Sequence, residues 1–272
     1  MPQLFPVSPT IVTIKPKSNL EDEVASLRAE LLVEKNARIA AESKLAFLHA
    51  EPTAGDPPPS RMAIIVGLAK LAESRDDDTG KHLSRIRHYT TLLADAVSTL
   101  HPEQLSKSDV SVIGATSVLH DIGKVGIPDE ILLSPSRLTV DQFTTMKRHT
   151  SIGADILISL SEQLGRDPWV DTAIQITLGH HERWDGAGYP FGLRGATNNV
   201  PARIVAVADV YDALTTRRVY KDAMSHDEAV ALINKESGSH FDPMVVDAFL
   251  SVLEKMREVA IRLAGQQQAD MV

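Results

Sequence analysis

The chain has 272 residues, of which 43% are hydrophobic and 4% aromatic, and it carries a net charge of −8 with no cysteine. This length suffices for one sizeable core with an appendage. The lack of cysteine excludes disulfides and thiolate metal sites, so any metal must be held by nitrogen and oxygen, and the acidic balance argues against binding of nucleic acid polymers. Neither a signal peptide nor the roughly 18 apolar residues of a membrane span are apparent, so we expect a cytoplasmic protein with no membrane contact.

The N-terminal segments are predicted to lie outside the main domain. Residues 1–18 are rich in proline and are expected to form a flexible arm. Residues 19–49 follow the spacing of an amphipathic helix, but charged Glu34 and Arg38 interrupt its apolar seam. This pattern leaves open a dimerising coiled coil or a single helix that packs on its own domain. Residues 50–60 contain four prolines and are predicted to be a linker.

From residue 61 to residue 264 the apolar spacing is that of helices almost throughout, with no convincing series of strands. We therefore predict an all-α domain over 61–264. The helices are expected at residues 61–74, 80–99, 108–120, 139–147, 149–160, 168–181, 202–214, 225–236 and 243–264. The loops are expected at 123–128, 134–137, 165–168 and 182–201. Residues 265–272 are predicted to be a disordered tail.

Several polar residues occupy the inward stripes of these helices. His82 shares a stripe with Ile86, and Asp78 lies one turn before it. His120 ends an apolar helix beside Asp121, and Asp209 lies in the middle of another. A buried imidazole or carboxylate is unfavourable unless a positive group satisfies it, which a metal ion does well.

Two further histidines, His149 and His181, also face inward by helical spacing. Each residue alone is better explained as a satisfied polar residue of the core. Without a metal, however, the whole set would need many hydrogen-bonding partners within one core. The set therefore predicts a metal site.

Two motifs carry a resemblance to a known family. The segments 119–128 and 180–190, which contain His120-Asp121 and Gly188-Tyr189-Pro190, resemble the two signatures of the HD-GYP family, a branch of the HD-domain metal phosphohydrolases. Similar segments follow in the expected order at 75–82, 146–149, 206–214 and 241–243. A lone His-Asp pair is a weak signal, whereas this ordered series is specific.

The resemblance implies an HD-domain bundle of about seven core helices, holding two or three divalent metal ions, usually iron or manganese. The implied ligands are Asp78, His82, His120, Asp121, His149, His180, His181 and Asp209. Asp121 would be shared between two ions. Some members have glutamate where Asp78 stands, and the shorter aspartate favours two ions over three.

The resemblance also implies an activity, the hydrolysis of cyclic di-GMP to pGpG or GMP through a metal-bridging hydroxide. Asp121 and Lys124 would be catalytic, and Lys124, Tyr189, Arg218 and Lys221 would contact the substrate. Taken without the family, Lys124 could complement a helix dipole, Arg218 and Lys221 could be a basic helix end, and the loop of Tyr189 could be a structural turn. Other possible functions are hydrolysis of another cyclic dinucleotide such as cyclic GMP-AMP, a nucleotidase activity, and a non-catalytic receptor.

The expected partners follow from the same resemblance. They are a cyclic dinucleotide substrate, a diguanylate cyclase (GGDEF) partner that contacts the Gly-Tyr-Pro loop at 188–190, and a second copy of the chain through residues 19–49.

Overall fold

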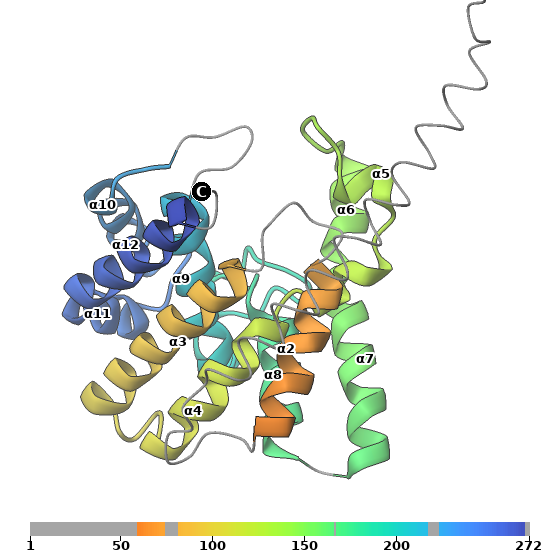
Figure 1. Ribbon diagram of the computed structural model, residues 1–272, viewed down its shortest axis with the longest axis horizontal. Helices are drawn as coiled ribbons and strands as arrows, with labels where there is room; N and C mark the ends of the chain where they lie inside the picture. The colour runs from red at the N-terminus through yellow and green to blue at the C-terminus, as the bar shows by residue number, and fades with distance from the viewer. Residues whose placement is uncertain (1–58, 74–80, 166, 217–222, 270–272) are drawn as a thin grey trace, which may run out of the picture. The chain divides into compact units, whose positions relative to one another are not determined.

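The computed structural model describes residues 59–73, 81–165, 167–216 and 223–269. Within these ranges the fold is all-α, as predicted, with two isolated bridges and no strand (Figure 1). The predictions for residues 1–18, for the helix or coiled coil at 19–49 and for the linker up to residue 58 lie outside the described residues. So do three predicted site residues, Asp78, Arg218 and Lys221.

The elements follow one another along the chain as α-helices and short 3₁₀ helices. They are α2 (Pro59–Glu73), α3 (Lys81–Leu100), α4 (Lys107–Thr116), η1 (Ser117–Leu119), η2 (Ile122–Gly126), α5 (Asp129–Leu132), α6 (Val140–Lys147), α7 (His149–Leu164), α8 (Pro168–Gly179), η3 (Gly195–Thr197), α9 (Val200–Thr215), α10 (His226–Lys235), α11 (Pro243–Ser251) and α12 (Leu253–Ala269). None of these helices combines the length and apolar character that a bilayer span requires.

Local signals start several of these helices. At α8 and α11, an aspartate side chain (Asp167 or Asp242) accepts a backbone N–H of the first turn, and proline follows at the first helical position. Thr139 begins α6 and Ser225 begins α10 with capping boxes. These short-range signals explain why the predicted starts of these helices lie close to the observed ones.

Three predictions of local structure were wrong. The expected single helix at 243–264 is two helices, because Val252 leaves helical geometry and its N–H binds the carbonyl of Phe249. The α-helix expected over 108–120 ends at Thr116 and continues as η1. The loop expected at 123–128 is largely the 3₁₀ helix η2. The disordered tail at 265–272 stays a prediction.

Two apolar clusters flank the segment that carries His120 and Asp121. The larger cluster unites α3, α4 and α8–α12 around the fully buried rings of Tyr89, Tyr211 and Phe249. The smaller cluster joins α2, η1, η2, α7 and α8. Full burial of one such ring stabilises the fold by roughly 1.5–3 kcal/mol, so the elements that surround the segment are firmly held.

The segment η1–η2 packs against α2, α3, α7 and α8. Its approach to α7 depends on Gly123, where a Cβ would lie 1.9 Å from the carbonyl oxygen of His149 and 2.4 Å from the amide nitrogen of Gly153. Only glycine permits this backbone contact. The contact brings the start of α7 next to Asp121.

Candidate metal centre

The candidate ligands come from five parts of the chain, and most stand at helix ends. His82 is in the first turn of α3, and His149 begins α7. His120 and Asp121 lie between η1 and η2, His180 and His181 follow α8, and Asp209 lies within α9. Their ligand atoms form two groups, within each of which all atoms lie within 4.8 Å of one another: Asp121, His149, His180 and His181, and then His82, His120 and Asp209.

Asp121 connects the two groups. Its Oδ1 lies 3.2 Å from Nε2 of His149 and 3.7 Å from Nε2 of His180. Its Oδ2 lies 3.3 Å from Nε2 of His120, and accepts a hydrogen bond from Nζ of Lys124 at 2.9 Å. The two oxygens of one carboxylate therefore face different groups of candidate ligands.

The backbone fixes the tautomers of three histidines. Nδ1 of His120, His149 and His180 each lies 2.8–3.1 Å from a main-chain carbonyl of the preceding turn. Since a carbonyl can only accept, Nδ1 carries the proton and Nε2 presents a lone pair to the site.

The resulting lone pairs have no protein partner. Nε2 of His120, His149 and His180, together with Oδ1 of Asp121, are buried without a hydrogen bond. An unsatisfied buried polar atom destabilises the fold by about 1–3 kcal/mol. The combined cost of several such atoms in one place is offset if cations bind there. The residues present thus fit a centre for two divalent ions with nitrogen and oxygen ligands.

Electrostatics in the metal-free chain favour the ligand forms of His149, His181 and Asp121. At His120, burial acts to lower the pKa, but the charge of Asp121 outweighs it and raises that pKa. Burial lowers the pKa of His149 to about 4 and the pKa of His181 well below its ordinary value. Burial also tends to raise the pKa of Asp121, but the charges of Lys124 and His120 outweigh it and hold that pKa well below its usual range. Neutral imidazoles and an ionised carboxylate are the ligand forms.

Asp212 supports the centre, although its role was not anticipated. Its carboxylate lies 2.7 Å from Nδ1 of His82 and accepts two bonds from Arg85, at 2.5 Å and 3.0 Å. Burial lowers the pKa of His82, but the hydrogen bond to Asp212 and nearby carboxylates outweigh it and raise the pKa to about 9. Asp212 lies one helical turn after Asp209 in the same apolar helix, so the signal that identified Asp209 applied to it equally.

The Gly-Tyr-Pro loop borders the first group of ligands. The ring of Tyr189 stacks on that of His181 at 4.7 Å, and Nζ of Lys147 lies 5.4 Å from its centre. Gly188 permits a close turn, because a Cβ there would lie 2.6 Å from the carbonyl oxygen of His181. The carboxylate of Glu182 accepts the backbone N–H groups of residues 191 and 193. The loop is therefore anchored beside the site by its own contacts.

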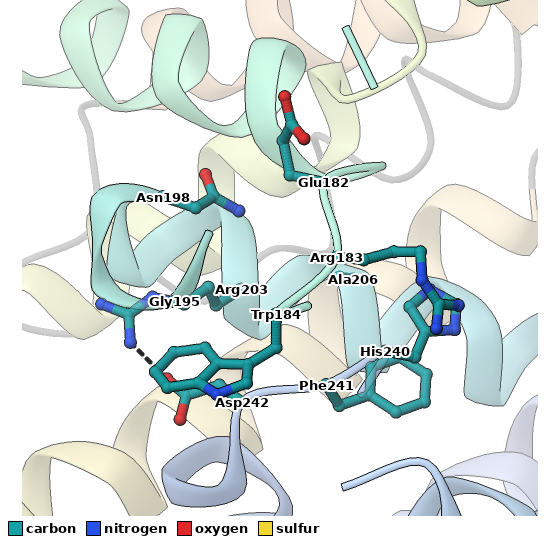
Figure 2. A pocket seen from close by; sticks show the side chains of 10 residues that line it. All are labelled: Glu182, Arg183, Trp184, Gly195, Asn198, Arg203, Ala206, His240, Phe241 and Asp242. Carbon is teal, nitrogen blue, oxygen red and sulfur yellow. Dashed lines mark hydrogen bonds and ion pairs between the residues drawn. The ribbon is translucent and has the colours of Figure 1, made fainter. Parts of the chain in front are cut away.

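A small pocket lies at the base of the same loop (Figure 2). It is lined by residues 182–184 at the start of the loop, by Gly195 and Asn198 near its end, and by residues 240–242. Arg203 pairs with Asp242 there, and its guanidinium lies 5.6 Å from the ring centre of Trp184. The backbone N–H of Trp184 donates to the carbonyl of His240. None of the candidate ligands in the two groups lines the pocket, so its ion pair and ring contact serve to fix the loop.

The structure thus brings together seven of the eight predicted ligands, with Asp78 outside the described residues. Lys124 lies at Asp121, and Tyr189 lies at His181. Arg218 and Lys221 are not described.

Comparison with known proteins identifies the family of the chain. A family model for the HD domain matches residues 67–245. Two relatives from Vibrio cholerae, named probable cyclic di-GMP phosphodiesterase and cyclic di-GMP phosphodiesterase, are 47% and 45% identical over 76% and 77% of this chain, and 48% and 43% of their own lengths. A third from the same organism, named 3'3'-cGAMP-specific phosphodiesterase 2, is 35% identical over 73% of this chain and 36% of its own length. The chain spans less than half the length of each of these relatives.

Proposed function

Because the chain belongs to the HD-GYP family of HD-domain metal phosphohydrolases, we propose that it is a metal-dependent phosphodiesterase that hydrolyses cyclic di-GMP to pGpG, GMP or both. The observation that carries this proposal is the carboxylate of Asp121, whose Oδ2 faces Nε2 of His120 and whose Oδ1 faces Nε2 of His149 and His180. These three nitrogen atoms are buried and have no hydrogen-bond partner in the described part of the chain. The resemblance of the whole motif series and the names of the relatives at 45–47% identity supply the substrate class.

The residues divide into two ligand sets. One ion would be held by Asp121, His149, His180 and His181, and the other by Asp121 with a second set composed of His82, His120 and Asp209. We propose iron or manganese, since imidazole and carboxylate ligands suit both. Two such ions, when bound, supply a nucleophile from water at neutral pH and stabilise charge on phosphoryl oxygens.

The chain's own residues position the substrate and control its charge. Lys124, whose side chain is 21% exposed, donates to Asp121, and we propose that its ammonium also contacts a non-bridging phosphate oxygen. Tyr189, held by stacking on His181, forms a wall beside the phosphate. Arg218 and Lys221 are proposed to add positive charge that an acidic chain otherwise lacks for an anionic substrate.

The setting of this activity is bacterial second-messenger signalling in the cytoplasm. We propose a diguanylate cyclase (GGDEF) as a partner at the Gly-Tyr-Pro loop, and a homodimer through residues 19–49.

A second candidate substrate is the mixed cyclic dinucleotide 3'3'-cGAMP. The relative that is 35% identical and named for that activity favours it. A non-catalytic receptor is less favoured, because each of the seven ligand positions among the described residues carries a histidine or an aspartate.

The test is a direct assay of products. The full chain is purified anaerobically, reconstituted with Fe(II) or Mn(II), and incubated with cyclic di-GMP or 3'3'-cGAMP before chromatography. We expect pGpG or GMP from cyclic di-GMP. Binding of both dinucleotides without turnover of either would refute the phosphodiesterase activity and favour the receptor.

A matched pair of variants tests the metal assignment. Asp121→Ala should lose metal and activity while keeping its helical circular dichroism, since its carboxylate connects the two ligand groups. Asp155→Ala, at an exposed position of α7, should keep both. Activity that survives in Asp121→Ala would show that the assignment is wrong.

A further inference from the structure

Glu73 is a buried carboxylate that the proposed reaction does not use. It is the last residue of α2, and its side chain is 6% exposed. Oε1 lies 3.8 Å from Nε2 of His82, and Oε2 is buried without a hydrogen-bond partner. A carboxylate so enclosed needs a positive partner to remain ionised.

The surroundings of Glu73 satisfy only one of its two carboxylate oxygens. Oε1 faces His82, whereas Oε2 is enclosed with no hydrogen-bond partner among the described residues. A buried polar atom without a partner is unfavourable, and a cation beside Glu73 would satisfy it.

The geometry identifies which cation this would be. His82 belongs to the group with His120 and Asp209, and its Nδ1 is engaged by Asp212, so Nε2 is its metal-facing atom. Two ligands with bonds of about 2.1 Å to one ion are at most about 4.2 Å apart. The observed 3.8 Å between Oε1 of Glu73 and Nε2 of His82 is within this limit.

We propose that Glu73 is a further carboxylate ligand of the ion held by His82, His120 and Asp209. The assignment rests on the metal centre of the proposed function and extends it to α2. The carboxylate of Glu73 does not belong to the group of His82, His120 and Asp209, whose ligand atoms lie within 4.8 Å of one another. The proposal therefore requires this carboxylate to rotate toward the ion as the ion binds. The rival explanation is a protonated carboxyl group that only fills space beside His82.

Glu73→Gln separates the two explanations, because glutamine is nearly isosteric with a protonated glutamate but is a poor metal ligand. The metal-free variant and wild type are loaded with Mn(II) and dialysed. Bound metal per chain is then counted by plasma mass spectrometry, and free Mn(II) is titrated by its electron paramagnetic resonance signal. We expect Glu73→Gln to lose one ion per chain, or to bind it at least about tenfold more weakly, while the other ion is retained.

Two controls accompany this variant. Glu162→Gln, at an exposed position of α7, should load metal as wild type does. Metal-free Glu73→Gln should melt no lower than metal-free wild type, whereas Mn(II) should raise its melting temperature less. If the glutamine variant does not fold, Glu73→Asp, whose carboxylate is one methylene shorter, carries the same test.

Wild-type metal content and affinity in folded Glu73→Gln would overturn the proposal and leave the space-filling explanation. The metal count uses no substrate. It therefore decides about Glu73 even if the wild type hydrolyses neither dinucleotide, a result that would refute the proposed function alone.

Discussion

Substitution of Asp212 by asparagine is expected to weaken both the fold and the metal centre. Asp212 is fully buried and binds Nδ1 of His82 and the guanidinium of Arg85, itself 5% exposed. Asparagine can still accept from His82, but its amide group faces the donors of Arg85, and the buried guanidinium loses the negative charge of this partner. Breaking a buried ion pair from one side costs about 3–5 kcal/mol.

That loss is large compared with the roughly 5–15 kcal/mol that stabilise a typical domain. For a domain of this size, 1 kcal/mol corresponds to about 2–4 °C, so metal-free Asp212→Asn should melt roughly 6–20 °C below wild type. The orientation of His82 would also loosen, and loss of such a supporting carboxylate weakens metal affinity about 10–100-fold.

Calorimetry of the metal-free proteins measures the first effect, and competition with a chelator for Mn(II) measures the second. Asp247→Asn, at an exposed position of α11, is the matched control and should behave as wild type. If Asp212→Asn melts and binds metal like the control, the carboxylate neither neutralises Arg85 nor orients His82, and the reasoning fails.

The remaining predictions concern two glycines and one histidine. Gly123→Ala would place a Cβ 1.9 Å from the carbonyl oxygen of His149 and should destabilise the fold by about 3 kcal/mol or more in urea unfolding; an unchanged midpoint would contradict the close packing. Gly188→Ala would place a Cβ 2.6 Å from the carbonyl oxygen of His181 and should cost about 1–3 kcal/mol and weaken Mn(II) binding; full affinity would show that the loop does not hold His181. The pKa of His82 rises from 6.5 to about 9 on folding of the metal-free chain, so the folded state binds the extra proton. The stabilisation of the fold by protonated His82 should be complete below pH 6.5 and should disappear as the pH rises through about 9. If the difference in melting temperature between wild type and His82→Gln stays constant over this pH range, the expected pH dependence is wrong.

The all-α class and most helix positions were predictable from the sequence because their signals are local. Apolar spacing marks each buried face, and pairs such as Asp167-Pro168 mark where a helix begins. The same reasoning failed at Val252, where one helix ends and the next begins within a continuous apolar pattern. Phe249 and Met256 are both fully buried, so the spacing of apolar residues carries no sign of the break.

The candidate ligands were also predictable in part, because polar residues on inward helical stripes are unusual. His82, His149 and His181 were identified in this way, and the motif series added His180. Spacing along one helix, however, does not show which side chains from different helices meet.

Helical spacing did not predict which side chains Asp212 and Glu73 contact. Asp212 is 130 residues from His82 along the chain, and Glu73 faces His82 from another helix. The residue types and their helical faces, which favour an oxygen- and nitrogen-ligated metal, are properties of the sequence. The division of the ligands into two groups around Asp121 arises from the packing of η1–η2 against α7, because contact through Gly123 brings His149 to one oxygen of that carboxylate while His120 faces the other.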